Sequence, residues 1–294
     1  MNSAPQPAYL IINADDYGYF NCVSRGILEL ARNGIVTATG LFANTEHFDK
    51  HVSWLQDCQG LDMGVHLNLT ERCPLTLGMR KKVVRWGGFF PDKFTVAKAV
   101  LTGFLKVDEV LTEWRAQIER CLEKGLTLRF LNSHEHIHML PILFPVFQTL
   151  SEEYKIEHIR FPTSDIFHCW SISPLVRNTL ISMLSIYNRR FLIRDTAHFI
   201  GIGPSGKLSL SYLQKILPRL KPGLVYELMC HPGYFDAAEI KDLRLLSYHD
   251  WESEFNVLNN KIVNELCHSH GIRLVGYKDV QLVEGQLNVI TGND

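Results

Sequence analysis

The chain of 294 residues is long enough for one β/α barrel or for two smaller domains. Hydrophobic residues make up 46 % and charged residues 21 %, which is ordinary for a soluble globular protein. The formal net charge of −1 argues against general attraction to nucleic acid or to an anionic membrane.

The seven cysteines are scattered, and no two form a Cys-x-x-Cys pair. An odd number without motif spacing is typical of free, mostly buried thiols in a reducing compartment. The N-terminus has no basic segment followed by an apolar run, so no secretory signal is expected. The stretch 175–193 contains three arginines, which makes it too charged and too short for a membrane span. We therefore expect a cytoplasmic protein in which this stretch is a core helix.

Short apolar or β-branched runs alternate with helical patterns along the chain. The runs lie at 9–12, 35–41, 61–69, 128–131, 156–161, 196–200, 223–229 and 272–276. Helical patterns lie at 24–33 (closed by Gly34), 49–56, 209–217 and 248–268. A further helical region ends near residue 125, and another helix is expected to begin at Pro141. This order predicts an α/β fold, a distorted (β/α) TIM-like barrel that forms a single domain over residues 1–294. A closed barrel is expected at this length, and a doubly wound open sheet is the alternative.

Polar residues follow four of these runs, at the strand ends where barrel enzymes place their chemistry. Asp15 and Asp16 follow the first run, His66 closes the third, His134 follows the fourth and His231 follows the seventh. We expect these side chains to converge on one mouth of the barrel.

The first motif is Asn13–Gly18, in which Asp15 and Asp16 are adjacent. Two neighbouring carboxylates repel each other unless a cation or hydrogen bonds offset the charge. A simple turn is the alternative, because Asp and Gly are common turn residues. If a metal binds here, one carboxylate suffices as ligand, and the other is free to act as a general base.

The histidine run 134–138 is the strongest signal, because His134, His136 and His138 occupy alternate positions. An extended segment would put all three imidazoles on one face, and imidazole is a common metal ligand. Which of the three binds metal is left open, and the other two are candidates for positioning substrate or for supporting contacts. His66 alone, between Val65 and Leu67, would more often be a core histidine than a ligand.

The fourth motif, 227–233, ends an apolar strand with His231 before a Pro-Gly turn. This placement suits a general acid, although a capping histidine is an equal alternative. Cys230 is expected to be a buried thiol. One Asp and two His ligands would leave positions open for water and substrate, so the residues favour a metal-dependent hydrolase acting on an amide. They do not name the substrate.

In order and spacing, the four motifs resemble the YdjC/ChbG family of carbohydrate deacetylases. The stretches 33–37 and 159–162 are also similar, so the resemblance extends from about residue 9 to about residue 235. It implies a TIM-like barrel, one divalent metal ion (Mg²⁺ or Zn²⁺) and removal of acetyl groups from N-acetylated sugars such as chitooligosaccharides.

Carried over by motif, the resemblance implies roles for individual residues. The metal ligands would be Asp16, His66 and His134. Asp15 would be the general base and His231 the general acid, and Arg160 would orient a catalytic carboxylate. A surface arginine is the alternative for Arg160. The candidates for substrate contact are Asn68, His136 and His138. The expected partner is the sugar alone, without nucleic acid, and a homodimer is left open.

Two features fall outside the family pattern or its known motifs. The family usually has Asp before the Ser-His pair, whereas this chain has Asn132, which keeps a hydrogen-bond acceptor but loses a charge. The aromatic segment 86–90 could stack on a sugar face, but packing onto the barrel rim is the favoured interpretation.

Two other functions compete with deacetylation. Another metal hydrolase, a phosphoesterase or an amidohydrolase, would commonly carry its His-x-His pair on the first strand, whereas here the histidine run follows the fourth. Phosphate recognition would also need a Gly-rich amide cradle or clustered arginines, and neither stands at the predicted strand ends. A sugar-binding barrel without activity would have no reason to keep all five strand-end residues.

Overall fold

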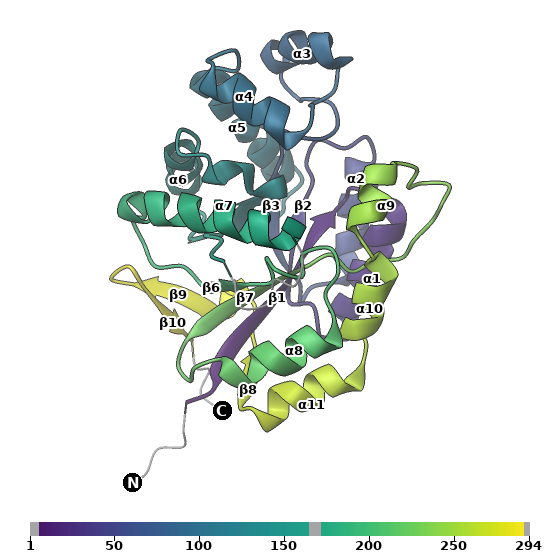
Figure 1. The fold of residues 1–294 in the computed structure, drawn as a ribbon, viewed down its shortest axis with the longest axis vertical. Helices are drawn as coiled ribbons and strands as arrows, with labels where there is room; N and C mark the ends of the chain where they lie inside the picture. The colour runs from purple at the N-terminus through teal and green to yellow at the C-terminus, as the bar shows by residue number, and fades with distance from the viewer. Residues whose placement is uncertain (1–5, 165–171, 291–294) are drawn as a thin grey trace.

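The computed structural model describes residues 6–164 and 172–290, so Cys169 lies outside the described residues. A parallel sheet occupies the centre, and helices pack around its outer face (Figure 1). The strands are β1 (Ala8–Tyr17), β2 (Ala38–Leu41), β3 (Asp62–Leu67), β4 (Leu128–Ser133), β5 (His158–Ile159), β6 (His198–Ile200), β7 (Val225–Cys230), β8 (Ile272–Leu274), β9 (Val280–Val283) and β10 (Gln286–Val289). The helices are α1 (Asn21–Arg32), α2 (Phe48–Trp54), α3 (Leu77–Val83), α4 (Lys93–Leu101), α5 (Val107–Glu123), α6 (Phe144–Glu153), α7 (Ile172–Asn188), α8 (Leu210–Ile216), α9 (Leu243–Tyr248), α10 (Trp251–Leu258) and α11 (Lys261–Ser269).

The sheet confirms the distorted β/α barrel and shows where the distortion lies. Its strand order is β5-β4-β3-β2-β1-β7-β6, with all neighbours parallel, and β8 pairs with β1 on the same edge as β2. Each of the eight predicted runs is one of the strands β1–β8. No pairing joins β5 to β6 in the described ranges, because both are very short, so the expected closed barrel is instead a curled sheet that is open there.

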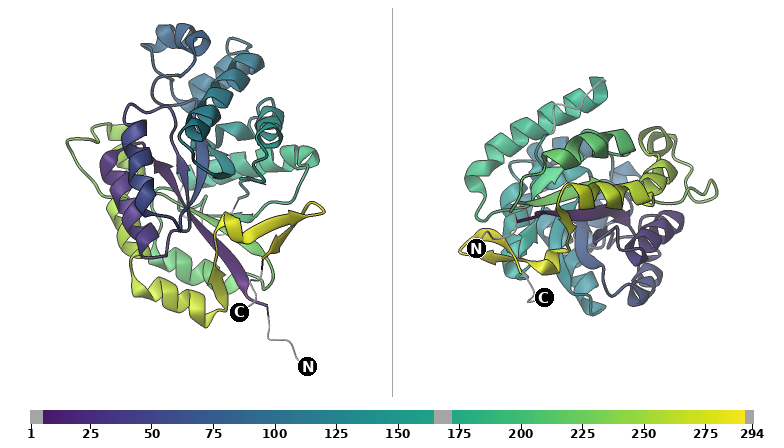
Figure 2. Two further views of the ribbon diagram at one scale, coloured as in Figure 1. Left: turned by 180° about the vertical axis from the view of Figure 1, so that it is seen from behind. Right: turned by 90° about the horizontal axis from the view of Figure 1, so that it is seen from below.

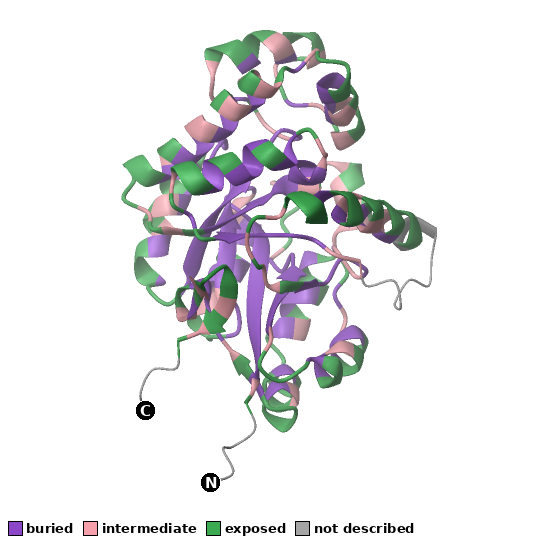
Figure 3. Ribbon diagram, turned by 90° about the vertical axis from the view of Figure 1, so that its left-hand side faces the viewer, coloured by how far each residue is buried: buried purple, intermediate pink, exposed green. Residues whose placement is uncertain are grey.

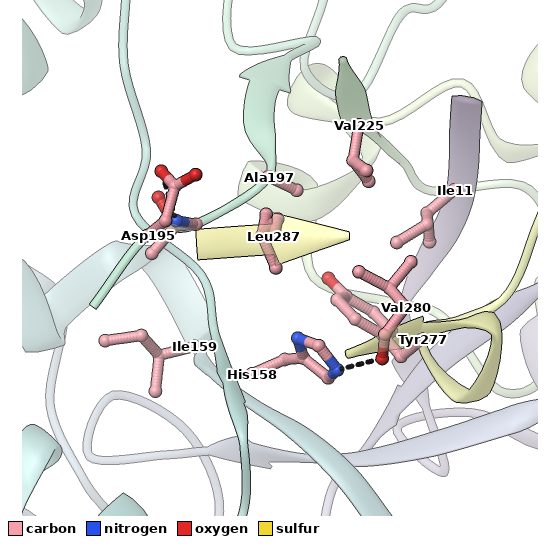
Figure 4. A pocket seen from close by; sticks show the side chains of 10 residues that line it. Ile11, His158, Ile159, Asp195, Ala197, Val225, Tyr277, Val280 and Leu287 are labelled. Carbon is pink, nitrogen blue, oxygen red and sulfur yellow. Dashed lines mark hydrogen bonds between the residues drawn. The ribbon is translucent and has the colours of Figure 1, made fainter. Parts of the chain in front are cut away.

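The C-terminal hairpin of β9 and β10 covers this gap. His158 on β5 donates from Nε2 to Val280 O (3.1 Å), and Asp195, shortly before β6, donates from its backbone N to Gly285 O (2.9 Å). Leu287 and Val280 point toward Ile11 and Val225 on the sheet, and they leave a hollow of only about 10 Å³ between them (Figure 4). This end of the curled sheet is therefore sealed, and a substrate must approach from the other end.

The apolar core has two parts, because successive side chains of a strand point to opposite faces. Leu10, Ile12 and Ala14 of β1 face the helices, whereas Tyr9 and Ile11 point into the curl. The sheet is buried on both faces while the outer helices remain exposed on their solvent side (Figure 3).

Three helix expectations are corrected by the structure. The pattern at 248–268 is two helices, α10 and α11, because the Asn260 side chain accepts from Ile262 N and starts a new helix. Helix α6 begins at Phe144 with Pro145, not Pro141, in its first turn. The expected core helix, α7, is buried on one side only: Ile181 is 6 % exposed and Ile186 75 %.

Two observations bear on the environment of the chain. Five of the six described cysteines are buried, Cys73 is exposed, and all six are free. Within the described ranges, every helix is too short or too polar to cross a bilayer.

The segment with α3 and α4 projects beyond the end of the sheet at which β1 terminates, opposite the N-terminus (Figures 1 and 2).

Candidate active site

Polar side chains collect at the carboxyl ends of the parallel strands, opposite the sealed end. Asp15 and Asp16 are neighbours in β1, so regular alternation would send them to opposite faces. The register of β1 against β2 shifts between Ala14 and Tyr17, and Asp16 has a left-handed backbone with φ 70°. Asp tolerates this conformation better than most residues. The irregularity lets both carboxylates reach the same pocket.

Asp16, His66 and His134 come together as the sequence predicted. Asp16 Oδ1 lies 3.3 Å from His66 Nε2 and 3.9 Å from His134 Nε2, and the two imidazole centroids are 5.6 Å apart. Asp16 Oδ1 is buried and has no hydrogen-bond partner among the described residues. The three strand ends therefore present three donor atoms to one small space.

The opposite ring nitrogens of both histidines are held by the protein. His66 Nδ1 donates to Asn132 Oδ1 at 2.8 Å. His134 Nδ1 is 2.7 Å from Thr70 Oγ1, whose own hydroxyl can donate to Asn68 Oδ1 at 3.4 Å. In the neutral rings, Nε2 then carries a lone pair that faces Asp16 Oδ1, an arrangement that is repulsive without a cation.

The donor set fits a divalent ion of the zinc class. Such an ion binds imidazole nitrogen and carboxylate oxygen at about 2.0–2.2 Å, which puts neighbouring ligand atoms roughly 3–4 Å apart. The separations of 3.3 and 3.9 Å fall in that range. Among the described residues, no group of three His, Cys, Asp or Glu side chains is placed closely enough to hold a metal ion as it stands, so these three would have to close around an ion.

The charges around this trio are reflected in its pKa values. Burial alone would raise the pKa of Asp16, but His66, 3.3 Å away, and the charge of His134 lower it. Burial alone would lower the pKa of His66, but Asp15 and Asp16 raise it. Asp16 is therefore ionised at neutral pH and available as a ligand.

Asp15 is held by a buried arginine. Arg160, just beyond β5, donates to Asp15 Oδ2 at 2.5 Å and to Oδ1 at 2.8 Å. Its Nε donates to Glu227 Oε1 on β7 at 2.7 Å, and Asn13 Nδ2 donates to the same oxygen. Burial alone would raise the pKa of Asp15, but the Arg160 charge holds it below its usual value. Arg160 is 0 % exposed, which excludes the alternative of a surface arginine.

Asn132 links the two halves of the site. Its Oδ1 accepts from His66, and its Nδ2 donates to Asp15 Oδ1 at 3.1 Å. An amide can accept and donate at once, whereas an ionised carboxylate can only accept. Gly40 makes room for this side chain, because a Cβ there would lie 2.9 Å from Asn132 Oδ1.

His231 is on the β7 side of the same space. Cys230, the last residue of β7, pairs with Ala14 of β1 in the parallel register, so His231 and Asp15 follow side by side on neighbouring strands. Its backbone N donates to Glu254 Oε2 at 2.5 Å, and its Nδ1 is buried without a partner among the described residues. The His249 ring lies 5.0 Å from the His231 ring and stacks on Trp251. Burial lowers the pKa of His249 to about 3, so that ring is neutral.

The histidine run does not stay extended. Residues 134–139 form a 3₁₀ turn in which Glu135 and His136 have φ of 53° and 54°. Only His134 therefore reaches Asp16. His138 is fully buried, pairs with Ser133 Oγ and Arg160 O, and stacks on Phe147. The prediction of three imidazoles on one face is wrong, because the left-handed residues turn the chain.

Two candidates for substrate contact, His138 and Asn68, are fully buried and hydrogen-bonded within the protein. His138 helps to fix Arg160 through its backbone oxygen. Asn68 donates to Asn44 and Glu71 O, and accepts from Thr70 N. Contact of these two residues with a substrate stays a prediction. His136 stays partly exposed and meets Phe199 edge-on, with ring centroids 5.7 Å apart.

Several residues of the site had no signal in the sequence. Thr70 holds His134, Glu227 holds Arg160, Glu254 holds the backbone of His231, and His249 flanks it. Tyr19 and Phe42 stack on each other, and the Phe42 ring meets the rings of His66 and His134 at 5.1 Å. An acidic residue inside an apolar strand, as at Glu227, is the one cue that could have been used.

Comparisons with known proteins agree with this fold and its motifs. A family model described as YdjC-like protein matches residues 9–269. A carbohydrate deacetylase of Brevibacillus brevis is 28 % identical over 271 residues, which cover 92 % of this chain and 99 % of that protein. A carbohydrate deacetylase of Geobacillus stearothermophilus is 30 % identical over 238 residues, covering 78 % and 81 %. A solved structure from Enterococcus faecalis superposes with a TM-score of 0.71 at 24 % identity, over 92 % of this chain and 98 % of that one, and so has the same fold.

Proposed function

Because the chain belongs to the YdjC-like protein family, we propose that it is a metal-dependent deacetylase that removes the acetyl group from an N-acetylated sugar. The relatives named carbohydrate deacetylase support the substrate class. One observation carries the chemistry: an unpartnered Asp16 oxygen faces two imidazole nitrogens, beside a second carboxylate that Arg160 holds in place.

Asp16, His66 and His134 would hold the metal. Two imidazole nitrogens in the donor set favour Zn²⁺ over Mg²⁺, which prefers oxygen ligands. When bound, such an ion supplies Lewis acidity toward the acetyl carbonyl and toward water. Asn132 and Thr70 would orient the two imidazoles, because they engage the nitrogens that face away from Asp16.

Asp15 is proposed as the general base that takes a proton from the attacking water. It is ionised, adjoins Asp16, and is fixed on both oxygens by Arg160. Asp15 Oδ1 accepts from both Arg160 and Asn132, whereas Oδ2 accepts only from Arg160, so the second lone pair of Oδ2 is available to water. Arg160 is proposed as a positioning residue, because it acts on Asp15 and is too deeply buried to meet a sugar.

His231 is proposed as the general acid that gives a proton to the departing nitrogen. An amine cannot leave as an anion, so protonation must accompany breaking of the C–N bond. His231 directly follows β7, whereas Asp15 lies on β1, so the two groups can act on the substrate from different strands. Glu254 would fix the direction of the histidine through its backbone N–H.

One assay separates this function from its competitors. The purified protein is incubated with N-acetylated mono- and oligosaccharides, a phosphomonoester and a non-sugar acetamide. The proposal expects acetate from the acetylated sugars, with little from the acetamide and no phosphate from the ester. Phosphate release or equal hydrolysis of the acetamide would favour another hydrolase, and sugar binding without turnover would favour a binding protein. A cytoplasmic location and a homodimer remain predictions that this assay does not address.

A further inference from the structure

A second hollow lies beside the proposed active site. It has a volume of about 470 Å³, within the range of small-molecule sites. We call it the arginine pocket, because its lining includes Arg72, Arg80 and Arg120, together with Thr45 and the exposed ring of Phe89. The arginines come from the segment after β3, from α3 and from α5.

The three guanidinium groups are held by backbone oxygens. Arg72 donates to Tyr19 O at 3.0 Å, Arg80 to Pro74 O at 2.8 Å and Arg120 to Ala43 O at 2.7 Å. None of the three is among the salt bridges that the described residues form. Backbone oxygens fix the direction of a guanidinium without neutralising its charge, so each keeps donors and charge for another partner.

The charge of the pocket is therefore positive. Glu46 is the acidic residue of its lining, and the Glu46 side chain is 76 % exposed beside His47. Three arginines and one glutamate give the lining a formal charge of +2. A concave surface with a net charge of one sign raises the local concentration of oppositely charged ligands.

Two polar atoms of this lining lack partners. The Thr45 hydroxyl is buried, with the residue 4 % exposed, and has no hydrogen-bond partner in the described part of the chain. Arg72 Nε is buried and unpartnered in the same way. Both atoms are closed to solvent, so they lie behind the wall of the hollow, and its binding capacity rests on the guanidinium groups.

We propose that the arginine pocket binds a small molecule that carries a phosphate or a carboxylate group. Arginine pairs with both groups through parallel N–H···O bonds. The Phe89 ring offers an apolar face to the body of the ligand.

The pocket is distinct from the proposed catalytic centre, although one segment borders both. Thr70 in this segment contacts His134, whereas Arg72, two residues later, lines the pocket. The inference does not depend on deacetylation, because it concerns binding, and binding is measured without turnover.

Calorimetry on the full chain tests the inference with glucose 6-phosphate, glucuronate and glucose. We expect saturable binding of at least one of the two anions and none of glucose, with the tighter anion identifying the group recognised. Arg80→Gln should weaken this binding by about 10-fold or more, because a charge-assisted hydrogen bond is lost. The matched control is Arg85→Gln, an equally exposed arginine that packs on Phe104 outside the pocket and should bind as the wild type does.

Three outcomes would overturn the inference. One is the absence of saturable binding for both anions. Another is that Arg80→Gln and Arg85→Gln weaken anion binding equally, because the effect would then come from the net charge of the protein and not from the pocket. The third is anion binding that is lost in Asp16→Asn but kept in Arg80→Gln, which would place the anion at the catalytic centre.

Discussion

Arg160 and Asp15 form a two-pronged ion pair inside the curled sheet, with N–O distances of 2.5 and 2.8 Å. The residues are 145 positions apart, and both are buried. The same guanidinium also pairs with Glu227, so two carboxylates share one cation. The proposed base is thus fixed by the fold itself.

Arg160→Met should destabilise the protein strongly, because it leaves Asp15 and Glu227 as unpaired buried carboxylates. Breaking a buried ion pair by removing one partner costs about 3–5 kcal/mol. Urea denaturation measures the change in the free energy of unfolding. The control is Arg115→Gln, which breaks a surface pair with Glu153 and should cost about 0–1 kcal/mol. Equal effects of the two variants would mean that the buried pair has no special part in stability.

Asp15→Asn should keep the metal and lose most of the activity. An amide still accepts hydrogen bonds from Arg160 but cannot take the proton of water, and a general base contributes about 10²–10⁴-fold. Steady-state kinetics and metal content are measured on the same preparation. Near-normal turnover would show that another group is the base.

Asn132→Ala should weaken metal binding by about 10–100-fold, the usual effect of removing a partner that orients a histidine ligand. It removes both the acceptor for His66 and the donor to Asp15. Asn132→Asp should weaken binding less, because the carboxylate still accepts from His66 Nδ1. Calorimetric titration with Zn²⁺ compares the variants. If Asn132→Ala binds Zn²⁺ with wild-type affinity, Asn132 does not help to orient the metal ligands.

His231→Ala should lower kcat with little change in KM, the pattern of an interaction made chiefly in the transition state. An activated acetyl ester, whose leaving group needs no proton, should be hydrolysed by this variant with a smaller loss. The control is His270→Ala, an exposed histidine at the end of α11 that should behave as the wild type does. Equal losses on amide and ester, or a rise in KM alone, would make His231 a binding residue.

The sequence predicted the parts of this molecule that depend on local pattern. The eight runs are the eight strands β1–β8, and Asp15, Asp16, His66 and His134 meet because parallel strands end on one side. The open edge between β5 and β6 was not predictable, since the pairing of short strands depends on the whole sheet and on the hairpin that covers the gap.

Side-chain contacts that depend on an irregular backbone also could not be predicted from the periodicity of the sequence. Alternation predicted one face for His134, His136 and His138, but two left-handed residues turn the segment. Alternation alone would likewise have separated Asp15 from Asp16, and a bulge reunites them. The Asn132 bridge was hidden for a similar reason, because its two partners lie on different strands and only the register brings them together.

The most direct test of the account measures acetate released from N-acetylated chitooligosaccharides together with bound metal. The protein is assayed as purified, after removal of metal by a chelator, and after return of Zn²⁺, alongside Asp16→Asn. We expect acetate release in proportion to bound metal, loss on chelation, recovery with Zn²⁺, and neither metal nor acetate with Asp16→Asn. Undiminished acetate release by fully metal-free protein, or by Asp16→Asn, would contradict it.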